Sequence, residues 1–217
     1  MQGKVWDLAT RLFHWLLVIA FAVACYSGFQ DKIVGNYGDI HRRAGIFILI
    51  LVLFRFIWGV VGSDTSRFSR FVKGPRSILH YVRGESQDSG DSIGHSPLGA
   101  LSVMAMLVLL LTQATLGLFG TDGILFEGPL AHLVDNSERI TLIHRWIGYS
   151  LMGLVGLHLA AILFYKLVKK KALVWPMISG NAEVQGTPPI MRSQWRAITV
   201  FFVSGGLVCS VIFIWLQ

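Results

Sequence analysis

The chain has 217 residues, of which 53% are hydrophobic and 14% are charged, and its formal net charge is +7. Soluble domains carry roughly 25% charged residues, so this composition excludes an ordinary water-soluble domain. The mean hydropathy of +0.60 indicates an apolar solvent. The surplus positive charge is therefore interpreted by its position along the chain, and no nucleic-acid partner is expected.

Five segments contain neither Asp nor Glu: residues 12–29, 44–62, 98–120, 146–165 and 197–216. Each is close to the ~20 residues that a helix needs to cross a bilayer. Because lipid offers no partners to backbone N–H and C=O groups, segments this apolar are expected to be helices rather than strands. The sequence predicts an all-α integral membrane protein with five transmembrane helices.

The first segment has an alternative interpretation as a signal sequence, with Lys4 and Arg11 as its basic region. A cleaved signal normally precedes an exported soluble domain, whereas more membrane segments follow here. His14 lies inside the apolar run, and a polar side chain there would cost free energy without benefit in a segment that served only as a targeting signal. We therefore expect this segment to remain as a helix.

The two cysteines, Cys25 and Cys209, lie in separate apolar segments and belong to no C-x-x-C or C-x-x-C-H pattern. This disfavours a disulfide framework, a zinc ribbon and covalently attached c-type haem. We expect both to be small buried hydrophobic side chains.

Positive charge alternates between the connecting segments. The N-terminus, the loop 63–97 and the segment 166–196 hold 13 Lys and Arg residues, against five in the segments 30–43 and 121–145. The positive-inside rule then places the N-terminus in the cytoplasm and the C-terminus outside. The outer segments also hold six acidic residues, which makes their face mildly acidic. Residues 121–145 are expected to include a short interfacial helix.

Four of the seven histidines lie in or at the ends of apolar segments: His14, His41, His144 and His158. Polar side chains at such positions are costly and are functional candidates. His144 and His158 face the same side of one predicted helix, about 21 Å apart along its axis. The predicted topology places His41 level with His144 near the outer face, and His14 level with His158 in the inner half.

Two histidines on facing helices suit the axial positions of a haem. Zinc and di-iron sites need three or four converging ligands, commonly carboxylates or thiolates, and the five segments contain no Asp or Glu. Haem needs only axial ligands, because the porphyrin supplies the other four. The pairs His14/His158 and His41/His144 therefore predict two b-type haems and electron transfer, since no position on either iron is left open.

A repeated pattern, H-R-x-x-G, begins at His41 and ends at Gly45, and recurs from His144 to Gly148. The glycine lies on the same helix face as the histidine and would leave room for a flat cofactor. Gly28 is a candidate for the same role. The alternative is that these glycines serve close helix–helix packing.

Three arginines are candidates for supporting a haem. Arg42 and Arg145 directly follow the two outer histidines, where they would either bind the propionates of the outer haem or anchor helix ends at the lipid headgroups. Arg55 lies inside the second segment, with no acid in any span to pair with. It would either extend to the interface or bind a propionate of the inner haem.

Four motifs, in this order, resemble the prokaryotic cytochrome b561 family, which includes the cytochrome b subunits of membrane-bound nickel–iron hydrogenases: Arg11-Leu-Phe-His14-Trp15, His41-Arg-x-x-Gly45, Arg55-x-x-Trp58-Gly59 and His144-x13-His158. The outer segment from Thr121 to His132 is also similar to members of this family. The resemblance covers roughly residues 5–180.

The resemblance implies a four-helix transmembrane bundle that binds two non-covalent haems b through the same four histidines. It divides the chain into a dihaem cytochrome b domain, residues 1–180, and a linker with an additional C-terminal transmembrane helix, residues 181–217, which departs from the family pattern. It implies a multi-pass protein of the bacterial cytoplasmic (inner) membrane, for which the count of Lys and Arg predicts a cytoplasmic N-terminus and a periplasmic C-terminus.

The function implied is electron transfer between the quinone pool and an extracytoplasmic redox partner, such as a c-type cytochrome. The protein would then be an electron carrier or the cytochrome b subunit of a quinone-linked oxidoreductase, in contact with membrane lipid and with no oligomeric state specified. One alternative is a stand-alone superoxide:quinone oxidoreductase. An alternative of another class is a non-redox membrane anchor or transporter, which would leave four costly histidines without a purpose.

Overall fold

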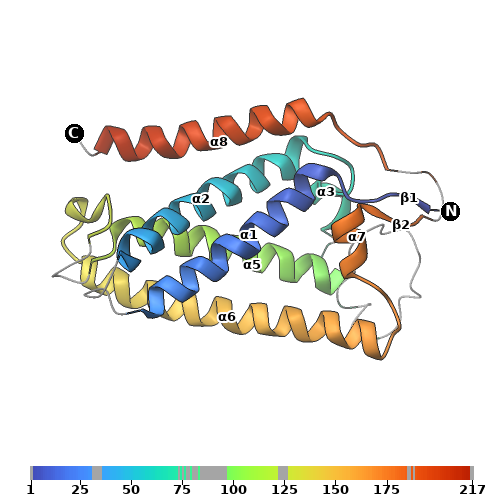
Figure 1. Ribbon diagram of the computed structural model, residues 1–217, viewed down its shortest axis with the longest axis horizontal. Coiled ribbons are helices and arrows are strands. Elements are labelled where there is room, and N and C mark those ends of the chain that lie inside the picture. Colours follow the sequence, from blue (N-terminus) through green and yellow to red (C-terminus); the bar gives the residue numbers. More distant parts are fainter. Residues whose placement is uncertain are drawn as a thin grey trace.

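The computed structural model describes residues 2–30, 36–72, 74, 76, 79, 83, 97–121, 127–184, 187 and 189–215. Five long helices extend along the molecule (Figure 1): α1 (Leu8–Phe29), α2 (Tyr37–Val61), α5 (Pro97–Phe119), α6 (Ser137–Leu167) and α8 (Gln194–Trp215). Each contains an apolar stretch long enough to cross a bilayer. The five predicted spans are therefore confirmed. Two histidines that received no role, His80 and His95, lie outside the described residues.

The shorter elements are β1 (Gln2–Lys4), α3 (Phe68–Phe71), the 3-10 turn η1 (Ala131–Leu133), α7 (Val174–Ser179) and β2 (Asn181–Glu183). Strands β1 and β2 pair antiparallel, with Gln2 opposite Glu183 and Lys4 opposite Asn181. In the described part of residues 121–145, the expected interfacial helix is reduced to the single turn η1 ahead of α6.

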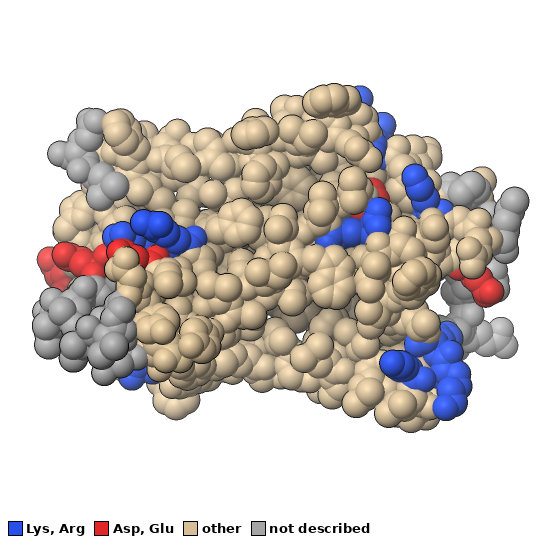
Figure 2. All heavy atoms as spheres, viewed as in Figure 1, with Lys and Arg blue, Asp and Glu red and all other residues tan. Residues whose placement is uncertain are grey.

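Charged side chains gather at the two ends of the molecule, and the middle of the face shown in Figure 2 carries none. Large apolar side chains are exposed along the long helices, among them Ile19 of α1 (60% exposed) and Phe202 of α8 (71%). An apolar surface of this extent suits lipid rather than water. Both cysteines are free, but Cys25 is only partly buried and Cys209 is exposed on α8, rather than both being buried as expected, because lipid-facing positions are apolar too.

Helix α2 lies at the centre of the packing. Half of the residues in its most apolar stretch are buried inside the protein, against 6% of the residues in the corresponding stretch of α6. It packs against α1, α5 and α8, whereas α6 packs chiefly against α5. The fifth helix, α8, therefore covers one side of α2 (Figure 1), and Val208 of α8 belongs to the same buried cluster as Ile48 and Val52 of α2.

A buried polar cluster joins the start of α1 to the end of α2. Asp7 is the N-cap of α1, where one carboxylate oxygen accepts the Thr10 N–H at 2.6 Å. Its other oxygen accepts hydrogen bonds from the Trp58 indole at 3.2 Å and from the Ser66 hydroxyl at 2.7 Å. Ser66 and Thr10 share a further hydrogen bond of 2.7 Å. Since Asp7 is only 8% exposed, these bonds fix the depth of α1 relative to α2.

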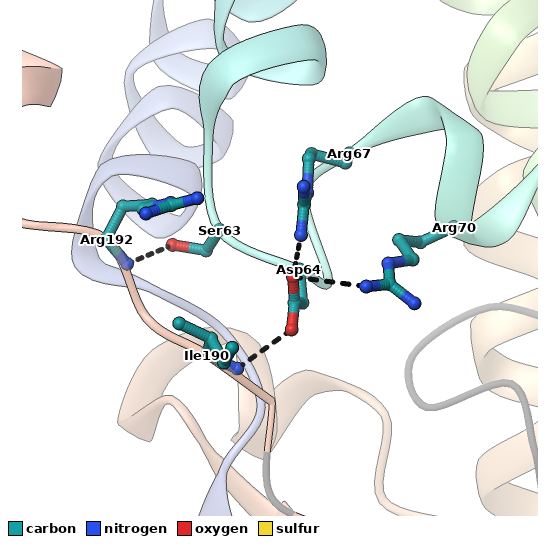
Figure 3. Close-up of polar contacts among 6 residues, drawn as sticks. All are labelled: Ser63, Asp64, Arg67, Arg70, Ile190 and Arg192. Carbon is teal, nitrogen blue, oxygen red and sulfur yellow. Dashed lines mark hydrogen bonds and ion pairs between the residues drawn. The ribbon is translucent and has the colours of Figure 1, made fainter.

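A second cluster, shown in Figure 3, attaches the segment before α8 to the turn after α2. The Asp64 carboxylate accepts the Ile190 N–H at 3.1 Å, and the Asp64 N–H donates to the Ile190 carbonyl at 3.1 Å. Ser63 accepts the Arg192 N–H at 2.9 Å. Arg67 pairs with Asp64, and Arg70 approaches it to 4.0 Å. The Ile190 N–H and these guanidinium groups hold the pKa of the Asp64 carboxyl below its ordinary value.

Replacing Asp64 with Asn should loosen this attachment. A carboxyl whose pKa is lowered by folding stabilises the fold above its unfolded pKa, about 3.9, and loses that effect as the pH falls through the folded pKa. At pH 7, Asp64→Asn should therefore lower the melting temperature by about 2–4 °C in detergent, and the difference should shrink below about pH 4. Scanning fluorimetry across pH measures both effects. Asp39→Asn, which breaks an exposed pair with Arg42, is the control; an equal loss there would contradict the prediction.

Gly59 allows the Phe68 ring to lie directly against α2. A Cβ at this position would stand 2.1 Å from the nearest ring atom of Phe68, and that ring in turn lies under the Arg55 guanidinium. Gly59→Ala should therefore lower stability by about 1–3 kcal/mol through overpacking, measured by thermal unfolding. Gly206→Ala is the matched control, because a Cβ there meets nothing within 4 Å. A neutral Gly59→Ala would show that Phe68 moves aside freely.

Candidate haem sites

The structure brings His41 and His144 together. His41 lies in the second turn of α2 and His144 in the second turn of α6. Their ring centroids are 6.0 Å apart, and the ring planes cross at 79°. The charge count and the helix spacing predicted that these two histidines lie at the same depth in the bundle. In the structure they do, and their rings are close together.

Each of these imidazoles is oriented by a backbone carbonyl of the preceding helix. The His41 Nδ1 lies 2.8 Å from the Ala24 carbonyl oxygen on α1, and the His144 Nδ1 lies 3.0 Å from the Gln113 carbonyl oxygen on α5. A carbonyl can only accept, so both Nδ1 atoms carry the proton in the neutral rings. The lone pair of each ring is then on Nε2, which is the arrangement usual for histidines that bind metals.

Small residues surround this pair. A Cβ at Gly28 would lie 3.1 Å from the His41 ring, and a Cβ at Gly117 would lie 3.2 Å from the His144 ring. A Cβ at Gly45 would meet nothing within 4 Å, whereas one at Gly148 would lie 3.0 Å from the Gln113 amide. The two glycines of the repeated H-R-x-x-G pattern thus have different surroundings: open space beside Gly45, and close packing on α5 beside Gly148.

The inner pair, His14 on α1 and His158 on α6, is close enough for electrostatic interaction. The His14 Nδ1 is buried and has no hydrogen-bond partner among the described residues. A buried ring nitrogen without a partner is unusual and calls for an explanation such as a bound group. The rings of His14 and Trp15 also pack in an edge-to-face arrangement, with centroids 5.1 Å apart.

Helix α6 carries one histidine of each pair and is continuous from Ser137 to Leu167. His144 and His158 are therefore separated by fourteen residues of unbroken helix, or about 21 Å along the axis. The two pairs form two levels, one towards each end of the bundle, and they share one side of α6.

The three candidate arginines lie in different environments. Arg42 pairs with Asp39 at 2.6 Å across one turn of α2, and Arg145 is exposed. Arg55 is only 3% exposed, and its guanidinium carbon lies 4.8 Å from the centre of the Phe68 ring. Its Nη1 is buried without a hydrogen-bond partner among the described residues. Asp7 attracts it electrostatically, so a carboxylate from just outside the spans supplies the counter-charge that the spans lack.

Two residues with contacts to these sites received no role from the sequence. Gln113 lies in the apolar interior of α5, and its side-chain Oε1 is buried with no partner in the described part of the chain. An amide inside an apolar run is a recognisable signal, because polar groups there are costly. Asp7 was detectable as an N-cap directly before an apolar helix, but its contacts with Trp58 and Ser66 are tertiary and leave no mark on the sequence pattern.

The donor set fits haem better than an isolated metal ion. Within the described residues, no three His, Cys, Asp or Glu side chains gather into a group that could hold a metal. Each level instead offers two imidazoles, which is what haem iron needs from a protein when both axial positions are filled. His132, which received no role, lies exposed in η1.

Comparison with protein families matches residues 5–180 to the family described as Prokaryotic cytochrome b561. Comparisons with curated proteins and with solved structures give no match. The matched region contains α1, α2, α5 and α6 with all four candidate ligands, and it ends before β2 and α8. Members of such a family are membrane-bound b-type cytochromes that bind haem and carry electrons. On this evidence, the chain belongs to the prokaryotic cytochrome b561 family.

Proposed function

We propose that this protein is a dihaem cytochrome b that carries electrons between the quinone pool and an extracytoplasmic redox partner. The proposed axial ligands are His41 and His144 for the outer haem, and His14 and His158 for the inner haem. Residues 1–180 form the proposed dihaem domain, and residues 181–217 add a linker and the helix α8.

The observation that carries this proposal is the geometry of the outer pair. The ring centroids of His41 and His144, which come from two different helices, are 6.0 Å apart. These two imidazoles would therefore hold one haem iron between α2 and α6. Their Nδ1 atoms face carbonyls, so the Nε2 lone pairs are available for the iron.

Bound haem supplies an iron that gains and loses one electron. The protein's own groups would set how easily it does so. The carbonyls of Ala24 and Gln113 hold the outer imidazoles in one orientation and increase their basicity. The buried cation Arg55 would hold an anionic propionate of the inner haem and favour the reduced iron.

The remaining supporting residues are proposed for the outer haem. Arg42 and Arg145 would reach its propionates from the two helix ends, and Arg42 would exchange its partner Asp39 for a propionate. Open space beside Gly45 would accommodate the porphyrin. Gly148, which packs against Gln113, would act by letting α5 approach α6.

The proposed path runs between the two levels, which are about 21 Å apart along α6. The positive-inside rule places the N-terminus in the cytoplasm of a bacterium and the C-terminus in the periplasm. Charge at both ends of the molecule supports a membrane-spanning orientation (Figure 2). The outer end, with its surplus of acidic residues, would meet a basic partner such as a c-type cytochrome.

Spectroscopy of ligand variants tests the assignment. The purified protein should contain two low-spin haems b per chain, quantified as the pyridine haemochrome. His14→Ala and His41→Ala should each lose one haem, because a single remaining imidazole leaves an axial position open. The control is His132→Ala, an exposed histidine of η1, which should keep both haems.

Different haem counts would lead to different conclusions. A protein with one haem would lack the proposed electron path across the membrane. A colourless protein, expressed with ample haem, would contradict the proposal and favour a membrane anchor or transporter instead. If two haems are present, copurification with another redox protein identifies a cytochrome b subunit. Turnover of superoxide and quinone by the isolated chain would instead identify a stand-alone superoxide:quinone oxidoreductase.

Enlarging Gly28 should disturb the outer site selectively. A Cβ there would already press on the His41 ring at 3.1 Å, so Gly28→Val should displace His41 and lower occupancy of the outer haem. The expected spectrum resembles that of His41→Ala, with one haem retained. Gly153→Val on α6 is the control, since a Cβ at Gly153 meets nothing within 4 Å. Equal haem loss in both variants would argue against a specific contact with His41.

A further inference from the structure

A cavity at the end of the molecule that carries β1 and β2 is lined by none of the four candidate haem ligands. It has a volume of about 270 Å³ and lies between the start of α1, the end of α2, the residues just before α8 and the first turn of α8. The hydrogen bond from the Arg192 N–H to the Ser63 hydroxyl holds its α8 side in place. The fifth helix therefore helps to build this cavity.

The polar lining of the cavity is mainly cationic. Lys4, Arg11 and Arg192 contribute to it, and Asp7 is its one acidic residue. The Asp7 oxygens are directed into the joint between α1 and α2, where they accept bonds from Thr10 and Trp58 as well as Ser66. The three cations are thus only partly compensated within the cavity.

One further feature favours an anion here. Ser193 and Gln194 of the lining stand at the start of α8, which is the positive end of the dipole of a long helix with no acidic residue in its first turn.

The lining also includes three apolar side chains, Leu8, Trp58 and Ala197. Leu8 is 38% exposed, and Leu12, one turn further along α1 towards the middle of the bilayer, is 52% exposed. A molecule held in this cavity would have its charged part among the cations and an apolar part along α1.

We propose that this cavity binds the phosphate headgroup of an anionic phospholipid, with an acyl chain lying along α1. Free phosphate would satisfy the cations but would leave the apolar side chains uncovered. The position at the starts of two transmembrane helices is level with the headgroups. With the proposed orientation, it faces the cytoplasmic leaflet, whose anionic lipids attract Lys and Arg.

Native mass spectrometry of the full-length holoprotein in mild detergent tests this proposal. The protein is titrated with phosphatidylglycerol and, separately, with phosphatidylcholine. We expect tighter binding of phosphatidylglycerol, and a roughly fivefold loss of that affinity in Arg192→Gln and in Lys4→Gln. The matched control is Lys166→Gln, which removes one exposed cation from the last turn of α6 outside the cavity and should bind phosphatidylglycerol like the wild type.

Three results would overturn the proposal. Equal binding of the two lipids would remove headgroup charge as the determinant. An equal loss in Lys166→Gln would indicate general surface charge rather than this cavity. Displacement of phosphatidylglycerol by inorganic phosphate would show that an anion alone is recognised. Haem content measured on the same samples should not change in any variant, so failure here is distinguishable from failure of the proposed electron-transfer function.

Discussion

The structure depends on one constraint: within the hydrocarbon zone, a polar group has to find its partner inside the protein. Helical carbonyls are already engaged in the helix, but each has a second lone pair. The outer histidines use it. His41 of α2 bonds to the Ala24 carbonyl of α1, and His144 of α6 bonds to the Gln113 carbonyl of α5. Each histidine is therefore oriented by the helix that precedes its own.

This arrangement explains how the bundle is assembled from two helical hairpins. Helices α1 and α2 pack extensively, as do α5 and α6, and α2 joins the hairpins by packing on α5. Each hairpin delivers one outer histidine in a fixed orientation. The opposite end of the bundle is organised differently, because there the buried Asp7 and its partners set the depth of α1, and with it the depth of His14, seven residues further along the same helix face.

The spans, their number and the two levels of histidines were predictable, because a bilayer imposes a length on apolar segments and a helix imposes a spacing on side chains. The short strands β1 and β2 were not, since three residues show no periodicity and their pairing joins segments that are far apart in the sequence, residues 2–4 and 181–183. The attachment of the segment before α8 to Asp64 could not be predicted either. The Asp64 carboxylate binds the backbone N–H of Ile190, and a backbone partner is not recognisable from the type of residue. The expectation that both cysteines are buried was wrong for Cys209, which is exposed, and Cys25 is only partly buried, because sequence hydropathy does not separate core from lipid-facing positions.

The pairing of β1 with β2 has a consequence for the order in which the protein forms. Strand β1 precedes α1 in the chain, and β2 comes after α1, α2, α5 and α6. Domains usually fold as their residues emerge from the ribosome, but β1 cannot pair before β2 has been synthesised. This end of the bundle can therefore close only after the four helices between the two strands have been made.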